Sequence, residues 1–246
     1  GNATRALERL PVHDKRYTAT MKFGATSDTL DIWGQVRTTD APIPSLAAIE
    51  AALPAFRGDI RQVPPMTSAL KKDGVRLYDL ARQGIEIERE ARDVSVYTLD
   101  IVDFDAHKGE LTIDCHCSKG TYIRVLAEEI GDALGVPATL SALRRTQAGV
   151  FSLAQCHTLP EILAAAENGE LETNGWVLPI ESVFTPLPAL HVNSGVKAHL
   201  LNGCPPSHYA AADGRYRTYD ETGAFLGLAS VEGGVLKVEK LFCERG

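Results

Sequence analysis

Two segments of alternating apolar and polar residues, 94–105 and 109–117, flank a turn around Lys108 and lead directly into a helical segment. Such alternation is typical of half-buried strands, and a short Gly-bearing turn between two strands predicts an antiparallel hairpin. The segment that follows carries three apolar residues at helical spacing: Leu126, Ile130 and Leu134. This order of elements predicts a mixed, mostly antiparallel sheet with helices packed on it.

The same patterns predict a strand over 15–28 and an amphipathic helix over 45–56 that begins with Ser45 as its N-cap. The helix after the hairpin is predicted to have Ser118 or Thr121 as its cap. Further short elements are a helix over 3–10, a helix over 76–84, a helix over 159–169 and, over 140–151, either a short helix or a pair of strands.

The composition suits a folded protein of two domains, with 246 residues of which 44% are hydrophobic and 23% are charged. We expect an α/β (α+β) domain over 1–183 and a small all-β domain over 187–246. No apolar run approaches the roughly 18 to 20 residues of a membrane span, and no basic-then-apolar signal segment is visible. The five cysteines include no CxxC pair and suit reduced thiols, so we expect a cytoplasmic protein with no membrane contact.

The string Cys115-His116-Cys117 raises the question of a metal site. Alternation along a strand puts both thiols on one face and the imidazole on the other, so one ion does not easily collect all three, and no metal site is predicted. The net charge of −7 argues against non-specific nucleic-acid binding but leaves room for a local basic groove. Positive charges cluster at three places, each of which by itself also suits a solvated surface: Lys15-Arg16, Lys71-Lys72 and Arg144-Arg145.

Four blocks of sequence, in this order, resemble the bacterial tRNA pseudouridine synthases of the TruB type. They are "DKRYTATMKFGATSDTLDIWGQV", "PPMTSALKKDGVRLYDLARQGIEIEREAR", "CSKGTYIRVLAEEIG" and "LRRT", and together they cover most of residues 1–151. The segment from "VNSGVKAHLLNGCPP" onward resembles more loosely the PUA-type RNA-binding domain of that family. Because four ordered blocks agree, the resemblance is more specific than any single motif.

The resemblance implies an isomerase that acts on a uridine in the T loop of tRNA. The base is detached from the sugar, turned and rejoined through carbon, with no cofactor and no metal. This chemistry needs a carboxylate beside the sugar and a pocket for a flipped-out nucleotide. The resemblance further implies a pseudouridine synthase sheet followed by a PUA-like domain, and we expect a monomer, since no heptad pattern is present.

The family tyrosine, which stacks by the base and is a candidate base for the sugar proton, falls on Tyr17, and the family arginine that pairs with the catalytic aspartate falls on Arg124. Tyr17 also suits a core tyrosine, and its ordinary pKa of about 10 would have to fall before it could act as a base. Arg124 also suits a surface pair with Glu128. However, a cation in the first turn of a helix faces the positive end of the helix dipole, which indicates a specific anionic partner.

Other positions match the family less distinctively. Tyr122 and Leu143 match residues that line the target pocket, although either also suits the core. The segment from Pro64 to Gly84 is expected to be a partly mobile loop that clamps RNA, with Thr67 where the family often has an aromatic residue. Four basic residues are candidate phosphate contacts: Lys71, Lys119, Arg144 and Arg145.

The family's nucleophilic aspartate lies in a motif like "GHTGTLDPxATG", which no string of the sequence matches. The string around Asp31 imitates its core, but its spacing from Tyr17 matches a different block, so Asp28 and Asp31 are assigned to a structural turn. The chain is then a fragment that lacks the N-terminal segment with the nucleophile, half of a split pair, or a member without catalysis. The alternatives to an enzyme are a non-catalytic RNA-binding module and a protein-interaction scaffold.

Overall fold

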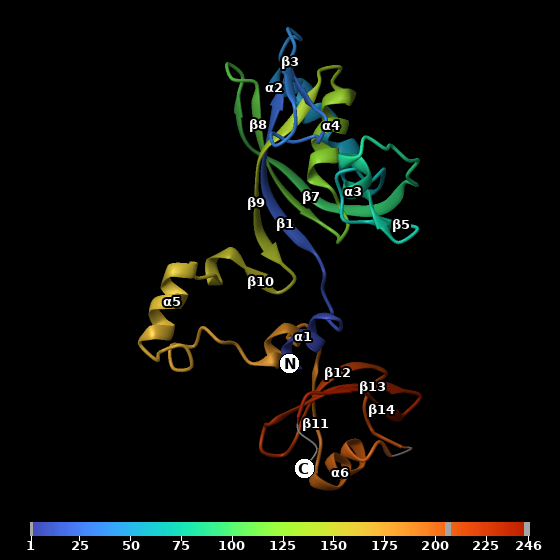
Figure 1. Cartoon of the computed structure of the whole chain (residues 1–246). Coiled ribbons are helices and arrows are strands. Elements are labelled where there is room, and N and C mark those ends of the chain that lie inside the picture. Colours follow the sequence, from blue (N-terminus) through green and yellow to red (C-terminus); the bar gives the residue numbers. More distant parts are fainter. Residues whose placement is uncertain (1, 205–207, 244–246) are drawn as a thin grey trace. The chain divides into compact units, whose positions relative to one another are not determined.

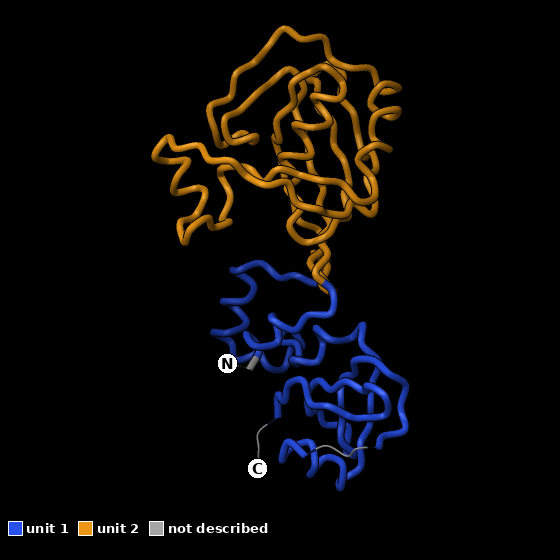
Figure 2. Tube along the Cα trace, turned by 90° about the vertical axis from the view of Figure 1, so that its right-hand side faces the viewer, with its two compact units in different colours: residues 1–12, 155–246 blue, residues 13–154 orange. Residues whose placement is uncertain are grey.

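The computed structural model describes residues 2–204 and 208–243, and its contacts group into two compact units (Figure 2). One unit comprises residues 13–154, and the other joins residues 1–12 to residues 155–246. Parts of the predicted all-β domain, 205–207 and 244–246, lie outside the described residues, as does Gly1. The predicted domain boundary between 183 and 187 stays a prediction.

The unit of residues 13–154 is built on one six-stranded sheet in the order β10-β9-β1-β8-β7-β4 (Figure 1). All neighbouring strands in this sheet are antiparallel. Its strands are β1 (Lys15–Phe23), β4 (Gly58–Gln62), β7 (Arg92–Asp105), β8 (Glu110–Cys117), β9 (Ala138–Ala148) and β10 (Phe151–Ser152). The predicted hairpin is therefore confirmed as β7 and β8, and residues 140–151 form strands rather than a helix.

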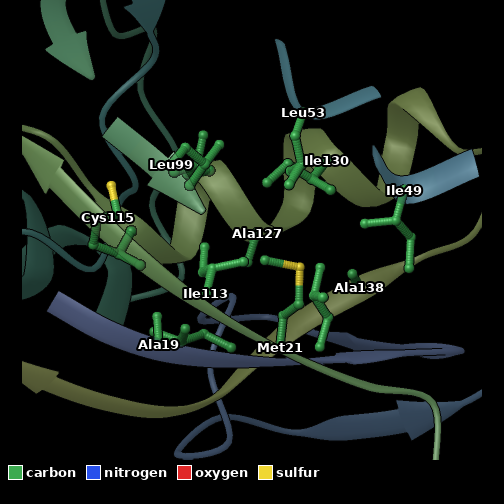
Figure 3. Close-up of a cluster of buried hydrophobic side chains, with 14 of the residues drawn as sticks. Ala19, Met21, Ile49, Leu53, Leu99, Ile113, Cys115, Ala127, Ile130 and Ala138 are labelled. Carbon is green, nitrogen blue, oxygen red and sulfur yellow. The ribbon is translucent and has the colours of Figure 1, made fainter. Parts of the chain in front are cut away.

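One face of this sheet carries the core. Alternate residues of β1, namely Ala19, Met21 and Phe23, are at most 2% exposed, whereas the residues between them are polar and only half-buried. The helix α4 (Ile123–Ala133), the helix α2 (Leu46–Ala52) and the 3-10 turn η1 (Leu53–Phe56) contribute to the same cluster. Figure 3 shows these side chains gathered between sheet and helices. The two-residue period of the sequence thus decides which face is buried.

Close approach of α4 to β9 depends on Gly131. A Cβ at this position would lie 2.7 Å from the Ala138 Cβ and 2.7 Å from the Val136 carbonyl oxygen, so a larger residue does not fit without a shift of backbone. The buried side chains of α4, including Leu126 and Ile130, are thereby brought onto the sheet. This packing fixes where the first turn of α4 lies.

Of the two N-caps predicted for α2 and α4, the first is confirmed and the second is wrong. Ser45 is the N-cap of α2, as predicted, and its hydroxyl accepts a hydrogen bond from the Ala48 amide. The predicted cap of α4 at Ser118 or Thr121 is wrong, because the N-cap residue is Tyr122 and its side chain makes no capping bond. The two hydroxyls have other partners: Ser118 accepts from the Ser95 amide of β7, and Thr121 donates to the Ser118 carbonyl.

Two small hairpins extend from this unit. The first pairs β2 (Ala25–Ser27) with β3 (Val36–Thr38), and we call its connecting residues 28–35 the hairpin tip. The second pairs β5 (Lys71–Lys72) with β6 (Val75–Arg76) and leads into α3 (Leu77–Arg82), which confirms the predicted short helix there.

The other unit contains a four-stranded sheet in the order β11-β12-β13-β14, in which only the β11–β12 pair is parallel. Its elements are α1 (Asn2–Leu7), α5 (Leu159–Glu167), η3 (Ile180–Phe184), β11 (Ala189–His191), α6 (Ser194–Leu201), β12 (Gly214–Tyr219), β13 (Phe225–Glu232) and β14 (Val235–Leu241), with η2 (Leu153–Gln155) at the junction of the two units. A mostly antiparallel α/β sheet and a small β sheet are thus both present, as the sequence predicts.

Across the described ranges, no helix combines the length and the apolar character that crossing a membrane requires.

Candidate functional site

Arg124 in the first turn of α4 forms an ion pair with Asp31 in the hairpin tip. Its Nη1 donates to the Asp31 Oδ2 at 2.9 Å, and its Nη2 donates to the Thr67 carbonyl oxygen at 2.6 Å. Both charged side chains are largely buried, with 20% of Arg124 and 17% of Asp31 exposed. The guanidinium therefore joins three segments that are far apart in the sequence, and its charge has the anionic partner that the helix dipole indicated.

The alternative surface pair of Arg124 with Glu128 does not form, because the guanidinium is turned toward Asp31. Burial raises the pKa of the Glu128 carboxyl, and the nearby Asp132 raises it further. Burial also raises the pKa of Glu129, on the same turn of the helix. These carboxyls line a hollow of about 290 Å³ together with Leu30, which precedes Asp31, and Thr67, whose carbonyl accepts from Arg124.

The Asp31 carboxylate is held by further donors. Its Oδ1 accepts hydrogen bonds from the Thr29 hydroxyl at 2.7 Å and from the Trp33 amide at 3.1 Å. The preceding residue, Leu30, has a positive φ of 64°, and Asp31 itself bridges to Leu140 of β9. The prediction of a structural turn was therefore incomplete for Asp31, which shapes the turn and also holds Arg124.

The start of α4 is fixed by a side chain that the sequence did not single out. Gln62, 1% exposed at the end of β4, accepts from the Tyr122 amide at 3.0 Å and donates to the Tyr122 carbonyl at 3.4 Å. The amide side chain thus takes over part of the capping role that neither Ser118 nor Thr121 fills. Because Tyr122 is two residues before Arg124, this contact also positions the guanidinium.

Tyr17 lies on β1 with its ring partly buried against the core cluster. It pairs with Arg145 of β9 on one side and with Cys115 of β8 on the other. Burial raises the pKa of the Tyr17 phenol above 10.0, although the nearby Arg145 acts in the opposite direction. In the described structure Tyr17 is therefore a neutral phenol near pH 7, and no described hydrogen bond joins it to Arg124.

Tyr122 is half-buried, whereas the other predicted pocket and phosphate residues lie at exposed positions. Leu143 is 49% exposed, so the alternative of a core leucine is wrong. Leu143, Arg144 and Arg145 are consecutive on β9, between two irregularities of the β1–β9 register. Lys71 is exposed on β5, and Lys119 is exposed in the turn before α4. Register breaks of this kind are frequent beside active sites, where they re-aim side chains.

The two thiols of the Cys115-His116-Cys117 string are fully buried in the core cluster, on the face opposite to His116. His116 instead contacts the Tyr97 ring at a centroid distance of 5.0 Å. The predicted alternation is confirmed. Within the described ranges, no three side chains of His, Cys, Asp or Glu are grouped as metal ligands.

The chain is similar to known proteins in both sequence and fold. Residues 1–123 match the TruB family pseudouridylate synthase N-terminal domain, and residues 124–185 match the tRNA pseudouridylate synthase B C-terminal domain. The tRNA pseudouridine synthase B of Neisseria meningitidis serogroup A is 42% identical over 243 residues, which are 98% of this chain and 78% of that protein. The enzyme of the same name from Pseudomonas fluorescens is 42% identical over 94% of this chain and 76% of its own length.

Solved structures share the fold. A Cbf5-Nop10-Gar1 complex contains a chain that aligns with a TM-score of 0.70 and 22% identity over 99% of this chain and 71% of its own length. An H/ACA RNP bound to a substrate RNA containing 2′-deoxyuridine gives a TM-score of 0.70 at 20% identity, over 99% of this chain and 70% of its own. The sheet with α4 on its core face is thus a Cbf5-like fold. The chain belongs to the TruB family of pseudouridylate synthases, which are isomerases.

Proposed function

We propose that this protein isomerises a uridine in the T loop of tRNA to pseudouridine. The observation that carries the proposal is the 42% identity, over 98% of the chain, to an enzyme named tRNA pseudouridine synthase B. The reaction breaks the bond between the base nitrogen and the sugar, turns the base and forms a bond through C5. The C5 proton is released, and the nitrogen that left the sugar takes up a proton. No oxidant or cofactor is needed for this isomerisation.

In this proposal Arg124 is the arginine that orients the reacting groups, and its geometry supports the role. Asp31 and Thr67 hold the guanidinium at its Nη1 and Nη2 atoms. A fixed cation in a largely buried site holds a nearby carboxylate ionised more effectively than a cation in water does. Tyr17 acts by stacking beside the base, and its raised pKa argues against a phenolate in the free protein.

The binding surface we propose combines the pocket residues Tyr122 and Leu143 with exposed cations. Arg144 and Arg145 continue β9 directly beyond Leu143, and Lys119 precedes α4 by a few residues. Lys71 lies on the β5–β6 hairpin, which forms part of the proposed RNA clamp. Cations that contact the backbone, with a flipped-out base in a pocket, are the usual arrangement for single-stranded RNA loops. The partner is the T arm of tRNA, and a monomer is proposed to bind it.

We further propose that the nucleophilic carboxylate is not supplied by residues 1–246. Asp31 is the carboxylate in contact with Arg124, but Oδ2 binds the guanidinium and Oδ1 already accepts two hydrogen bonds. Such a carboxylate suits positioning better than attack on a sugar. The absence of a string like "GHTGTLDPxATG" from the sequence supports the same proposal. The absence of this motif also favours a second candidate function, a non-catalytic RNA-binding form of the same fold.

The proposed binding of the T arm is tested by measuring the affinity of the protein for two RNA hairpins. One hairpin has the T-arm sequence, and the other has the same stem with a scrambled loop. We expect the T-arm hairpin to bind at least tenfold more tightly, because loop bases enter the pocket only in the right order. In the variant Lys71→Gln/Lys72→Gln, binding should weaken and the slope of log K against log salt should become shallower. Equal affinity for both hairpins would contradict the proposed substrate.

A further inference from the structure

Trp33 stands out on the hairpin tip because it is 89% exposed. A tryptophan this exposed leaves a large flat apolar ring in water, although side chains of this type are usually well buried. The chain has a second tryptophan, Trp176, whose ring stacks on His157 at a centroid distance of 3.9 Å. Trp33 has no ring partner of that kind among the described residues.

The backbone beneath Trp33 is held in place by side chains on either side. The Trp33 amide donates to the Asp31 Oδ1, and the Gln35 amide donates to the Asp28 Oδ1 at 2.7 Å. Between them, Gly34 has no space for a side chain, since a Cβ would lie 2.1 Å from the Asp28 Oδ1. The ring is therefore presented to solvent by a fixed support, which reduces the entropy lost when a ligand packs on it.

The hairpin tip is anchored to the sheet as well as to the ion pair. The Ile32 amide donates to the Leu140 carbonyl, and the Leu140 amide donates to the Leu30 carbonyl, both at 3.0 Å. Asp31 in turn binds Arg124. One carboxylate thus contacts both the candidate catalytic arginine and the backbone of Trp33, so the exposed ring belongs to the border of the candidate site.

The surroundings of Trp33 favour a nucleic acid over an apolar protein surface. Arg37, on the β3 arm of the same hairpin, is exposed and forms no ion pair with any described residue. Beside it lies a hollow of about 420 Å³ with a polar lining: Thr26, Ser27, Asp28, Gln35 and Arg37. A flat apolar ring on the same hairpin as a cation without a described ion pair suits the base and the phosphate of a bound nucleic acid.

We propose that Trp33 stacks on an unpaired base of the bound RNA and thereby positions the loop that contains the reacting uridine. This inference rests on the proposed function, because it takes RNA as the ligand. Stacking does not depend on base identity, since every base has a flat face. Trp33 therefore contributes affinity and orientation, whereas the choice of uridine depends on the pocket.

The test compares the dissociation constants of wild type, Trp33→Ala and Trp33→Phe for a labelled T-arm hairpin. We expect Trp33→Ala to bind about 5- to 150-fold more weakly, the range reported for loss of one stacked base, and Trp33→Phe to stay within about threefold of wild type. The slope of log K against log salt should not change in Trp33→Ala, because no cation is removed. Val36→Ala, a matched apolar truncation on the same hairpin at a residue that is 44% exposed, should bind like wild type.

A second measurement detects the contact directly. In Trp176→Phe the only remaining tryptophan is Trp33, so its fluorescence should be quenched when the RNA hairpin is added. If wild type binds RNA while Trp33→Ala binds equally well and the fluorescence is unchanged, the inference is wrong. If wild type itself fails to bind the hairpin, the proposed function fails first, and the two failures are thereby distinguished.

Discussion

Arg124 and Asp31, separated by 93 positions in the sequence, are joined by a 2.9 Å hydrogen bond between Nη1 and Oδ2. The pair places an anion at the N-terminal turn of α4, where a lone arginine would be disfavoured by the helix dipole. It also links the hairpin tip to the helix.

Removing one partner of the pair should destabilise the protein. We expect Arg124→Met to lower the free energy of unfolding by about 1 to 3 kcal/mol, because a largely buried carboxylate loses its counter-charge. The double variant with Asp31→Asn should lose less than the sum of the single changes, as measured by urea unfolding in a double-mutant cycle. The control is Arg61→Ala at the exposed Arg61–Asp93 pair, whose charged atoms are 3.6 Å apart, where the change should stay within about 0.5 kcal/mol. If the losses of unfolding free energy in the two single variants add up to the loss in the double variant, Arg124 and Asp31 are not directly coupled.

Gln62→Leu should weaken the start of α4. The change leaves the Tyr122 amide and carbonyl without their side-chain partner, which we expect to cost about 1 to 3 kcal/mol. Hydrogen exchange at the Tyr122 amide should become faster. Gln83→Leu is the control, since that glutamine is exposed and its side-chain amide donates to the Asp79 carbonyl of its own helix. Unchanged exchange in Gln62→Leu would show that the cap is not needed.

Gly34→Ala should loosen the hairpin tip. The new methyl group would meet the Asp28 Oδ1 at 2.1 Å and the Thr29 hydroxyl at 2.4 Å, so we expect a loss of about 1 to 3 kcal/mol in thermal unfolding. Gly195→Ala, within α6, meets nothing closer than 3.4 Å and should be neutral or stabilising. A Gly34→Ala variant as stable as wild type would mean that the tip adapts without cost.

Glu128→Gln should stabilise the protein near neutral pH. Burial, followed by Asp132, raises the pKa of Glu128 above 4.5, so the folded state binds the proton more tightly than the unfolded state does. Stability from this group is present at low pH and is lost as the pH rises through 4.5 to the raised folded pKa. We therefore expect the Tm of Glu128→Gln to exceed that of wild type at pH 7, with the difference vanishing at low pH, where both side chains are neutral. Glu50→Gln, at an exposed site on α2, is the control, and a lower Tm for Glu128→Gln at pH 7 would contradict the assignment.

The sequence predicted most of the sheet because alternation is a local signal. Ala19, Met21 and Phe23 identify the buried face without knowledge of any partner strand. The position of Arg124 in the helix also predicted an anionic partner. The identity of that partner was not predictable, because Asp31 meets Arg124 through a turn with Leu30 at positive φ and a bridge to Leu140.

The capping of α4 was missed for a similar reason. Hydroxyl residues before a helix predict a local cap, and Ser118 and Thr121 fitted that rule. The structure instead uses Gln62, 60 positions earlier, because β4 ends beside the start of the helix. The sequence also allowed Leu143 to lie in the core. In the structure Leu143 is exposed, on a part of β9 that lies between two irregularities in the pairing with β1.

The most direct test of the account measures tritium released from a T-arm RNA labelled at C5 of its uridines, with this chain as the only protein. Rejoining the base through C5 must expel that label. We expect that the RNA binds and that release stays at background, because we propose that Asp31 positions Arg124 and that residues 1–246 do not supply the nucleophile. Release above background would contradict this, because a carboxylate within residues 1–246 would then have to supply the nucleophile.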